Sequence, residues 1–201
     1  MKRGVVLIYL DVETYSPGEE PSFKDKAILI CYKEVDGPAL VWKEWEDGEK
    51  VVLQKFYSKL TGKLKTEKAV TLIGWNIVRF DVPFLTYRLF HHGVDRLENV
   101  LENFRKAYWR DLRLCLLPFN NYRFKGLKID EVVKRFKLQP PKYSGEEIRG
   151  FYDDGEYEKI VEHALSEAEL LSALNRRMMN VEEVMKAFGN SLKRRERFTR
   201  L

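Results

Sequence analysis

The chain has 201 residues, of which 44% are hydrophobic and 13% aromatic, and this is enough to fill the core of one domain. Its 36 basic and 31 acidic residues give a formal net charge of +5, which permits a polyanionic partner without requiring one. Its apolar runs are short and lack a signal-peptide cleavage site, so we expect neither a membrane span nor a signal peptide.

The first part of the chain predicts a meander of antiparallel strands followed by a helix. Three apolar runs are separated by a polar loop and by the turn sequence VDGP. Apolar residues at helical spacing over 48–62 then predict a helix that ends at Gly62. The three strands are predicted over 4–11, 26–34 and 38–45.

The rest of the chain predicts two more strands and several helices. Because strands come first and helices later, with no internal repeat, we expect an α/β fold with a mixed central sheet flanked by helices. We expect one domain over 1–179 and a helical, basic extension over 180–201. In chain order, we predict a strand over 68–76, a helix over 81–93, a strand over 107–118, and helices over 127–138, 154–179 and 181–201.

The two cysteines indicate the compartment. Cys31 and Cys115 lie in apolar surroundings and lack the spacing of metal ligands. We therefore expect both to be buried thiols in a reducing environment, without a disulfide. This predicts a cytoplasmic protein.

The first candidate functional feature is a pair of carboxylates at the end of the first apolar strand. Asp11 and Glu13 are two positions apart, so in a strand both side chains point to the same face and their charges repel. Asp81 follows a later strand and starts a helix, where it can face the same sheet edge. Taken on its own, Asp81 is better explained as an ordinary helix N-cap.

A third candidate feature lies on the predicted helix over 154–179. His163 and Glu167 are four residues apart and share one helix face, at the border of its apolar positions. Carboxylates that converge in one place need cations, and oxygen ligands favour Mg²⁺ or Mn²⁺. Two such ions suit phosphodiester hydrolysis, in which His163 would take the proton of the attacking water.

Three segments, taken in order, resemble the DEDD superfamily of 3′-5′ exonucleases. The closest likeness is to the proofreading exonuclease domain of B-family DNA polymerases and its stand-alone relatives. The third segment has His163 where the polymerase pattern has Tyr, and Glu167 where it has Asp; Glu162 and Glu169 are alternative carboxylates. Asp111 also has a counterpart in many members. The matching segments are Asp11-Val12-Glu13-Thr14, Asn76-x-x-x-Phe80-Asp81 and His163-x-x-x-Glu167.

The resemblance implies a ribonuclease H-like fold and a metal-dependent 3′-5′ exonuclease that releases 5′-mononucleotides. It implies two Mg²⁺ or Mn²⁺ ions, single-stranded nucleic acid as substrate, with DNA favoured over RNA, and a part in DNA repair. An RNA-processing exonuclease and a non-catalytic nucleic-acid-binding or assembly module with a degenerate site are the alternatives. The implied metal ligands are Asp11, Glu13, Asp81 and Glu167, the implied catalytic base is His163, and the implied substrate-binding residues are Thr14, Tyr15, Trp75, Asn76 and Phe80.

Several features have both a functional and an ordinary interpretation. Base stacking is one use of Tyr15, Trp75 and Phe80, and core packing is the other, which we favour for Phe80. His91 and His92 need no metal at a helix C-terminus. The basic tail could bind a phosphate backbone, remain solvated or pack on a second subunit in a homo-oligomer. Its residues are Leu192, Lys193, Arg194, Arg195, Arg197, Phe198, Arg200 and Leu201.

Overall fold

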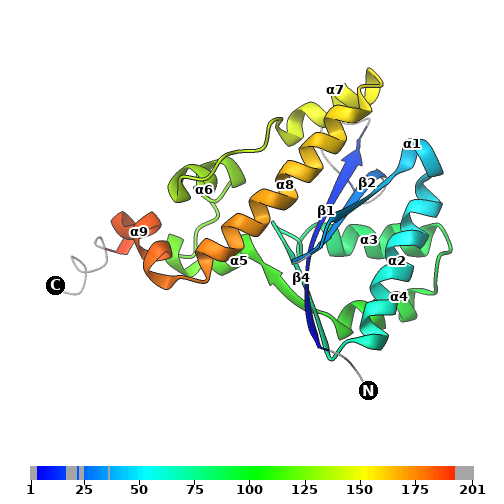
Figure 1. Cartoon of the computed structure of the whole chain (residues 1–201), viewed down its shortest axis with the longest axis horizontal. Helices are drawn as coiled ribbons and strands as arrows, with labels where there is room; N and C mark the ends of the chain where they lie inside the picture. The colour runs from blue at the N-terminus through cyan, green and yellow to red at the C-terminus, as the bar shows by residue number, and fades with distance from the viewer. Residues whose placement is uncertain (1–3, 17–21, 23–24, 36, 193–201) are drawn as a thin grey trace.

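The computed structural model describes residues 4–16, 22, 25–35 and 37–192, which form a five-stranded sheet with helices on both faces (Figure 1). The strand order is β3-β2-β1-β4-β5. β1 pairs antiparallel with β2, and β2 with β3, whereas β1–β4 and β4–β5 are parallel. The predicted antiparallel meander and the mixed sheet of an α/β fold are confirmed.

The strands differ from the prediction mainly at their ends. β2 (Lys26–Glu34) has the predicted bounds, and β3 (Ala39–Lys43) and β4 (Ala69–Gly74) are slightly shorter than predicted. β1 (Val5–Tyr15) does not end at Asp11, because its pairing with β2 continues through Tyr15. Asp11 and Glu13 therefore lie within a strand.

The predicted strand over 107–118 is mostly wrong. Only β5 (Tyr108–Asp111) is extended, and α5 (Leu112–Leu116) follows it at once. The cause is Asp111, whose carboxylate accepts hydrogen bonds from the backbone N–H groups of Arg113 and Leu114 and so caps a helix there.

The remaining helices agree with the prediction in place but not always in length. α2 runs through Gly62 because a glycine inside a helix costs only about 1 kcal/mol relative to alanine. Short helices α1, α4 and α7 were not predicted. The helical elements are α1 (Glu44–Asp47), α2 (Glu49–Thr66), α3 (Asp81–His91), α4 (Leu97–Lys106), η1 (Pro118–Asn120), α6 (Ile129–Phe136), η2 (Gly145–Glu147), α7 (Ile148–Asp153), α8 (Tyr157–Met178) and α9 (Val181–Leu192).

The two faces of the sheet are covered by different helices, as Figure 1 shows. Ile8 and Leu10 pack in one apolar cluster with residues of α2, α3 and α4. Tyr9 belongs to the opposite cluster, with Ile73 and residues of α5, α6, α8 and α9. Because strand side chains alternate, Asp11 and Glu13 lie on the Tyr9 face, toward α8.

Other expectations have mixed outcomes. Cys31 is buried, as expected, but Cys115 is exposed because it lies on the outer side of α5; both are free thiols.

His92 pairs with the buried carboxylate of Glu49, and His91 stacks on Tyr87. No helix in the described part of the chain combines the length and apolarity needed to cross a bilayer.

The C-terminal helix packs on the body of the protein. Val184 and Phe188 of α9 are buried in the same cluster as Phe136 of α6. The basic tail beyond α9, with Lys193, Arg194, Arg195, Arg197 and Arg200, lies outside the described residues, as do Phe198 and Leu201.

Gly74, at the end of β4, lies so close to the backbone of β1 that there is no room for a side chain. A Cβ atom there would lie 2.8 Å from the carbonyl oxygen of Leu10 and 3.0 Å from Cβ of Ile77. We expect Gly74→Ala to destabilise the protein by about 1–3 kcal/mol. Gly62→Ala, which meets nothing within 4 Å in α2, should stabilise it by about 0.5–1 kcal/mol. Urea denaturation of both variants checks this, and equal stability of Gly74→Ala and the wild type would contradict it.

Candidate active site

The centre of the candidate site is a carboxylate pair on β1. Asp11 pairs with Cys31 and Glu13 with Leu29 of β2, and the register shifts between Glu13 and Thr14. An irregularity of this kind bends a strand and re-aims its side chains. Glu13 is 8% exposed, so it is a charged group almost removed from water.

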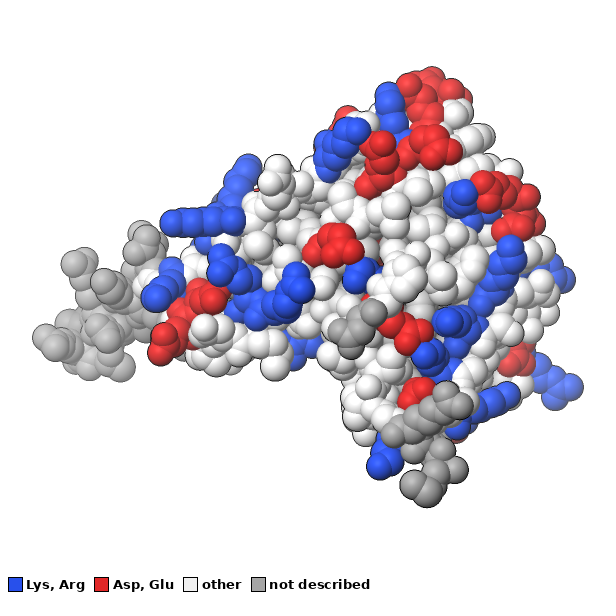
Figure 2. Space-filling model, in the orientation of Figure 1, with Lys and Arg blue, Asp and Glu red and all other residues white. Residues whose placement is uncertain are grey.

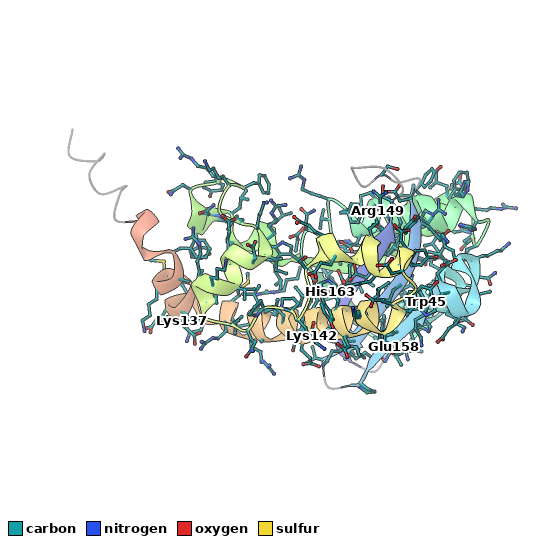
Figure 3. The ribbon with its side chains drawn as sticks, turned by 90° about the horizontal axis from the view of Figure 1, so that it is seen from above. Trp45, Lys137, Lys142, Arg149, Glu158 and His163 are labelled. Carbon is teal, nitrogen blue, oxygen red and sulfur yellow. The ribbon has the colours of Figure 1, made fainter. Side chains whose placement is uncertain are left out.

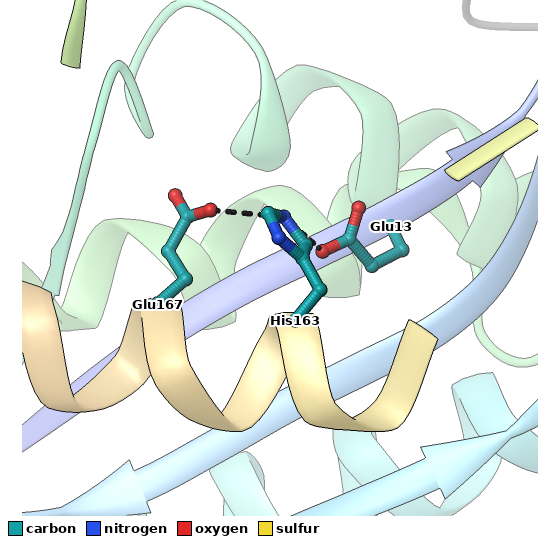
Figure 4. A group of neighbouring side chains, drawn as sticks. All are labelled: Glu13, His163 and Glu167. Atoms are coloured by element: carbon teal, nitrogen blue, oxygen red, sulfur yellow. Dashed lines mark ion pairs between the residues drawn. The ribbon is translucent and has the colours of Figure 1, made fainter. Parts of the chain in front are cut away.

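α8 brings two further groups to Glu13. Nε2 of His163 lies 3.3 Å from Oε1 of Glu13 and 3.2 Å from Oε2 of Glu167 (Figure 4). Ligand-type atoms of these three residues all lie within 4.8 Å of one another. The i, i+4 spacing on α8 places His163 and Glu167 on one helix face, and that face meets β1.

The orientation of His163 is fixed from the other side of its ring. Nδ1 lies 2.9 Å from the carbonyl oxygen of Tyr143, in the segment that connects α6 to α7. A carbonyl only accepts, so Nδ1 carries a proton and Nε2 faces the carboxylates. In Figure 3, the ribbons of α7 and α8 lie on either side of the labelled His163, which is 2% exposed.

Asp81 lies in the first turn of α3, and it does not act as the N-cap. The N-cap position is Phe80, and no side chain caps this helix. Asp81 is only 5% exposed, and after burial the charges of Glu167 and Glu13 further raise the pKa of its carboxyl group. The structure therefore brings Asp81 from α3 into the same electrostatic environment as the β1 pair.

Asp111 has a structural role beside the site. In addition to capping α5, its two oxygens accept hydrogen bonds from the backbone N–H groups of Asn76, at 3.2 Å, and Val78, at 3.3 Å. This carboxylate thus holds the turn that leads to Asp81. Asn76 itself has φ +60° and accepts a hydrogen bond from Nη1 of Arg113.

Burial raises the pKa of each β1 and α3 carboxyl in the site, and neighbouring negative charges add to this effect. Burial raises the pKa of Asp11 well above its ordinary value, and the charges of Glu167, Glu13 and Asp81 raise it further. Burial likewise raises the pKa of Asp81 and that of Glu13, the latter to about 7 although His163 opposes the change. Burial disfavours charge on His163, but Glu167 and Glu13 outweigh it and raise its pKa to about 9.

These groups fit a divalent cation. Oε1 of Glu13 is buried and has no hydrogen-bond partner among the described residues. Carboxylate oxygens are the donors that Mg²⁺ and Mn²⁺ prefer, and a cation would offset the repulsion that raises the pKa values. The candidate ligands Glu162 and Glu169 are exposed on α8 and pair with Lys142 and Lys33, away from Glu13.

A cleft of about 750 Å³ opens beside His163 and Glu167. Trp75 lines it, as the stacking interpretation requires. Phe80 instead stacks on Phe84 against the core, which agrees with the packing interpretation. Tyr15 is also held by the protein: its ring contacts Tyr152, and its hydroxyl donates a hydrogen bond to Asp153 of α7.

Several residues that border this cleft were not predicted from the sequence. Three cationic side chains, Arg113, Lys128 and Lys142, line it, together with apolar side chains. Arg113 and Lys128 lie in segments predicted as a strand and a helix, whose patterns do not show that both side chains border one cleft. For Lys142, the available signal was the sequence Pro-Pro-Lys-Tyr over 140–143. On the face in Figure 2, Lys and Arg gather over the part with α6 and α9, and Asp and Glu gather at the α7 end.

No protein-family model matches the sequence, and no curated protein matches it. Among solved structures, the chain is similar to the family B DNA polymerase from the hyperthermophilic archaeon Pyrobaculum calidifontis, with a TM-score of 0.65 and 17% sequence identity. The similarity covers 91% of this chain and 27% of the polymerase chain, so this protein spans about a quarter of that polymerase. At this identity the likeness concerns the fold, and it agrees with the expected ribonuclease H-like architecture.

The raised pKa values predict how stability depends on pH without metal. Glu13 changes from 4.5 to about 7 on folding and His163 from 6.5 to about 9, so the folded protein binds more protons than the unfolded chain between these values. We therefore expect the free energy of unfolding in EDTA to fall by several kcal/mol as pH rises from 4.5 to 9, because each pKa unit corresponds to about 1.4 kcal/mol. Urea denaturation across this range measures it.

Two variants serve as controls for this pH dependence. Glu13→Gln should flatten the decline, because the variant side chain cannot titrate. Glu102→Gln, at an exposed carboxylate on α4, should leave the decline unchanged. A stability that rises with pH over the same range would contradict the assignment of buried, crowded carboxylates.

Proposed function

We propose that this protein is a metal-dependent 3′-5′ exonuclease that removes 5′-mononucleotides from single-stranded nucleic acid, with DNA preferred over RNA. The observation that carries the proposal is the meeting of Glu13, His163 and Glu167, with Asp11 and Asp81 in the same electrostatic environment. The order of the three motifs supports it, as does the fold shared with a B-family DNA polymerase. We also propose a cytoplasmic location, which suits two free thiols.

Four carboxylates would hold the metal ions. Asp11 and Glu13 come from β1, Asp81 from the start of α3 and Glu167 from α8. Two bound Mg²⁺ or Mn²⁺ ions supply positive charge that stabilises the attacking and leaving oxygens of a phosphodiester. Glu167 is one methylene longer than the Asp of the polymerase pattern, and the distance of 3.2 Å between its Oε2 and Nε2 of His163 supports its role as the fourth ligand.

His163 would accept the proton of the attacking water at Nε2. Its Nδ1–H donates to the carbonyl oxygen of Tyr143, which fixes the tautomer with a lone pair on Nε2 when the ring is neutral. The pKa of about 9 belongs to a ring next to uncompensated carboxylates. Neutralising these carboxylates removes the cause of the shift and returns the ring toward neutrality near pH 7.

The cleft would hold the 3′-terminal nucleotide. Trp75 and Tyr143 offer ring surfaces for an unpaired base, while Arg113 and Lys128 offer positive charge for its phosphates. Thr14 follows Glu13 and Asn76 lies five residues before Asp81. Both belong to the proposed substrate-binding set, together with Tyr15 and Phe80, whose rings pack against Tyr152 and Phe84. Asn76 would act through its hydrogen bond with Arg113, which lines the cleft.

Metal binding is expected to stabilise the protein. At Mn²⁺ concentrations of about a hundred times Kd, the free energy of unfolding should rise by about 2.7 kcal/mol. Asp11→Asn should lose most of this gain, although without metal it should be at least as stable as the wild type because one repelling charge is gone. Thermal denaturation with and without Mn²⁺ checks both. An equal Mn²⁺ effect in Asp11→Asn and wild type would contradict the ligand assignment.

Exonuclease activity is expected to depend on Glu167 and not on Glu169. With 5′-labelled single strands of DNA and RNA in Mg²⁺ or Mn²⁺, the wild type should shorten the strand from its 3′ end. Glu167→Gln and Asp11→Ala should lower the rate about a hundredfold or more, whereas Glu167→Asp should retain or raise it. Glu169→Gln is the matched control on α8 and should remain active.

Replacement of the proposed catalytic base, His163, is a separate test that uses the same assay. His163→Gln should lower the rate about 10²- to 10⁴-fold, as removal of a general base does. A wild type that binds single strands but never hydrolyses them would support the non-catalytic module instead. Activity that survives Asp11→Ala would mean that this site is not the nuclease.

A further inference from the structure

The loop between η1 and α6 combines exposed rings and cations. Residues 121–126, with the sequence NYRFKG, alternate aromatic and basic side chains and are called here the aromatic–basic loop. Tyr122 is 64% exposed and Phe124 36% exposed, while Arg123 and Lys125 are exposed too. Two exposed rings that alternate with cations match the surface that unpaired nucleotides require.

The loop is held in one conformation by its own hydrogen bonds. Asn121 and Tyr122 have φ values of +55° and +58°, in the left-handed region that side chains other than glycine rarely adopt. The side-chain amide of Asn120 donates hydrogen bonds to the carbonyl oxygens of Arg123 and Lys125. A surface that is ordered in advance loses little entropy when a ligand binds.

Two arginines from other elements converge on Phe124. Cζ of Arg79, in the turn before Asp81, lies 4.9 Å from the centre of the ring, and Cζ of Arg113, on α5, lies 5.1 Å from it. Within the described part of the chain, neither guanidinium forms an ion pair with a carboxylate, and Nε of Arg113 is buried without a hydrogen-bond partner. Two positive charges are therefore held at one exposed ring without neutralisation, which suits phosphate.

Arg113 connects this cluster with the candidate active site. It lines the same cleft as His163, Glu167 and Trp75. Arg79 lies two residues before Asp81, so the cluster and the carboxylates are joined by one turn that Asp111 holds. A strand whose last nucleotide lies in the cleft would reach the aromatic–basic loop with the nucleotides that precede it.

We propose that the aromatic–basic loop, together with Arg79 and Arg113, binds the nucleotides upstream of the 3′ end in single-stranded nucleic acid. Phe124 and Tyr122 stack on bases, and the two guanidinium groups bind phosphates. Stacking of this kind needs unpaired bases, which selects single strands over duplexes. The position relative to the 3′ end rests on the proposed function, whereas the binding itself does not.

Equilibrium binding without hydrolysis tests this proposal. The probe is a fluorescein-labelled single strand of about twelve nucleotides, as DNA and as RNA, titrated with the full chain in EDTA and followed by anisotropy. We expect Phe124→Ala and Arg79→Ala each to weaken binding about tenfold, and Arg79→Lys to weaken it less. Arg79→Ala should also lower the slope of log affinity against log salt by about one.

Matched controls separate this surface from general positive charge. Phe90→Ala removes an exposed ring at the far end of α3, and Arg105→Ala removes an exposed arginine on α4; both should bind like the wild type. All replaced side chains are at the surface, and circular dichroism verifies folding. Unchanged affinity in Phe124→Ala and Arg79→Ala, or no binding by the wild type, would overturn the proposal.

The same measurements distinguish this proposal from the exonuclease proposal. If the wild type binds strands through Phe124 and Arg79 but hydrolyses none in Mg²⁺ or Mn²⁺, the loop proposal stands and the exonuclease proposal fails. If the wild type hydrolyses strands and both variants bind them normally, the reverse holds.

Discussion

The site depends on like charges held close together and away from water. Burial and mutual repulsion raise the pKa values of Asp11, Glu13 and Asp81, so without a cation the site keeps protons that ordinary carboxyl groups would lose. A fold that only needed stability would not collect such groups, since a buried charge without compensation costs several kcal/mol. This arrangement supports the proposal that a divalent cation binds here.

The surrounding structure holds these charges in place with ordinary interactions. Gly74 lets β4 approach Leu10 closely, and the register shift after Glu13 bends β1 at the carboxylate pair. The carboxylate oxygens of Asp111 accept hydrogen bonds from backbone N–H groups, and this fixes the turn before Asp81. The carbonyl of Tyr143 fixes the ring of His163. Each contact lies outside the carboxylate cluster yet decides its geometry.

The sheet could be predicted because strand alternation and turn residues are local signals. β2 was predicted to the residue, whereas the strand over 107–118 was wrong because Asp111 caps a helix there, and a cap depends on one side chain rather than on a pattern. The meeting of Glu13, His163 and Glu167 was expected from helix spacing and motif order, and their distances agree with that expectation.

The walls of the site could not be predicted in the same way. Phe80 lies in the second motif and Tyr15 follows the first. In the structure, however, Phe80 packs against Phe84, and Tyr15 donates a hydrogen bond to Asp153. Arg113 and Phe124 lie outside the three matching segments and come together only through the path of the chain after β5. Contacts of this kind depend on the tertiary fold, for which single-sequence patterns carry no signal.

The most direct test of the account is to locate bound metal. Crystals soaked in Mn²⁺ and measured at a wavelength where manganese scatters anomalously would show each ion as a peak. We expect peaks in contact with the carboxylates of Asp11, Glu13, Asp81 and Glu167. Saturating Mn²⁺ with no peak among these residues, or with peaks only elsewhere on the protein, would contradict it.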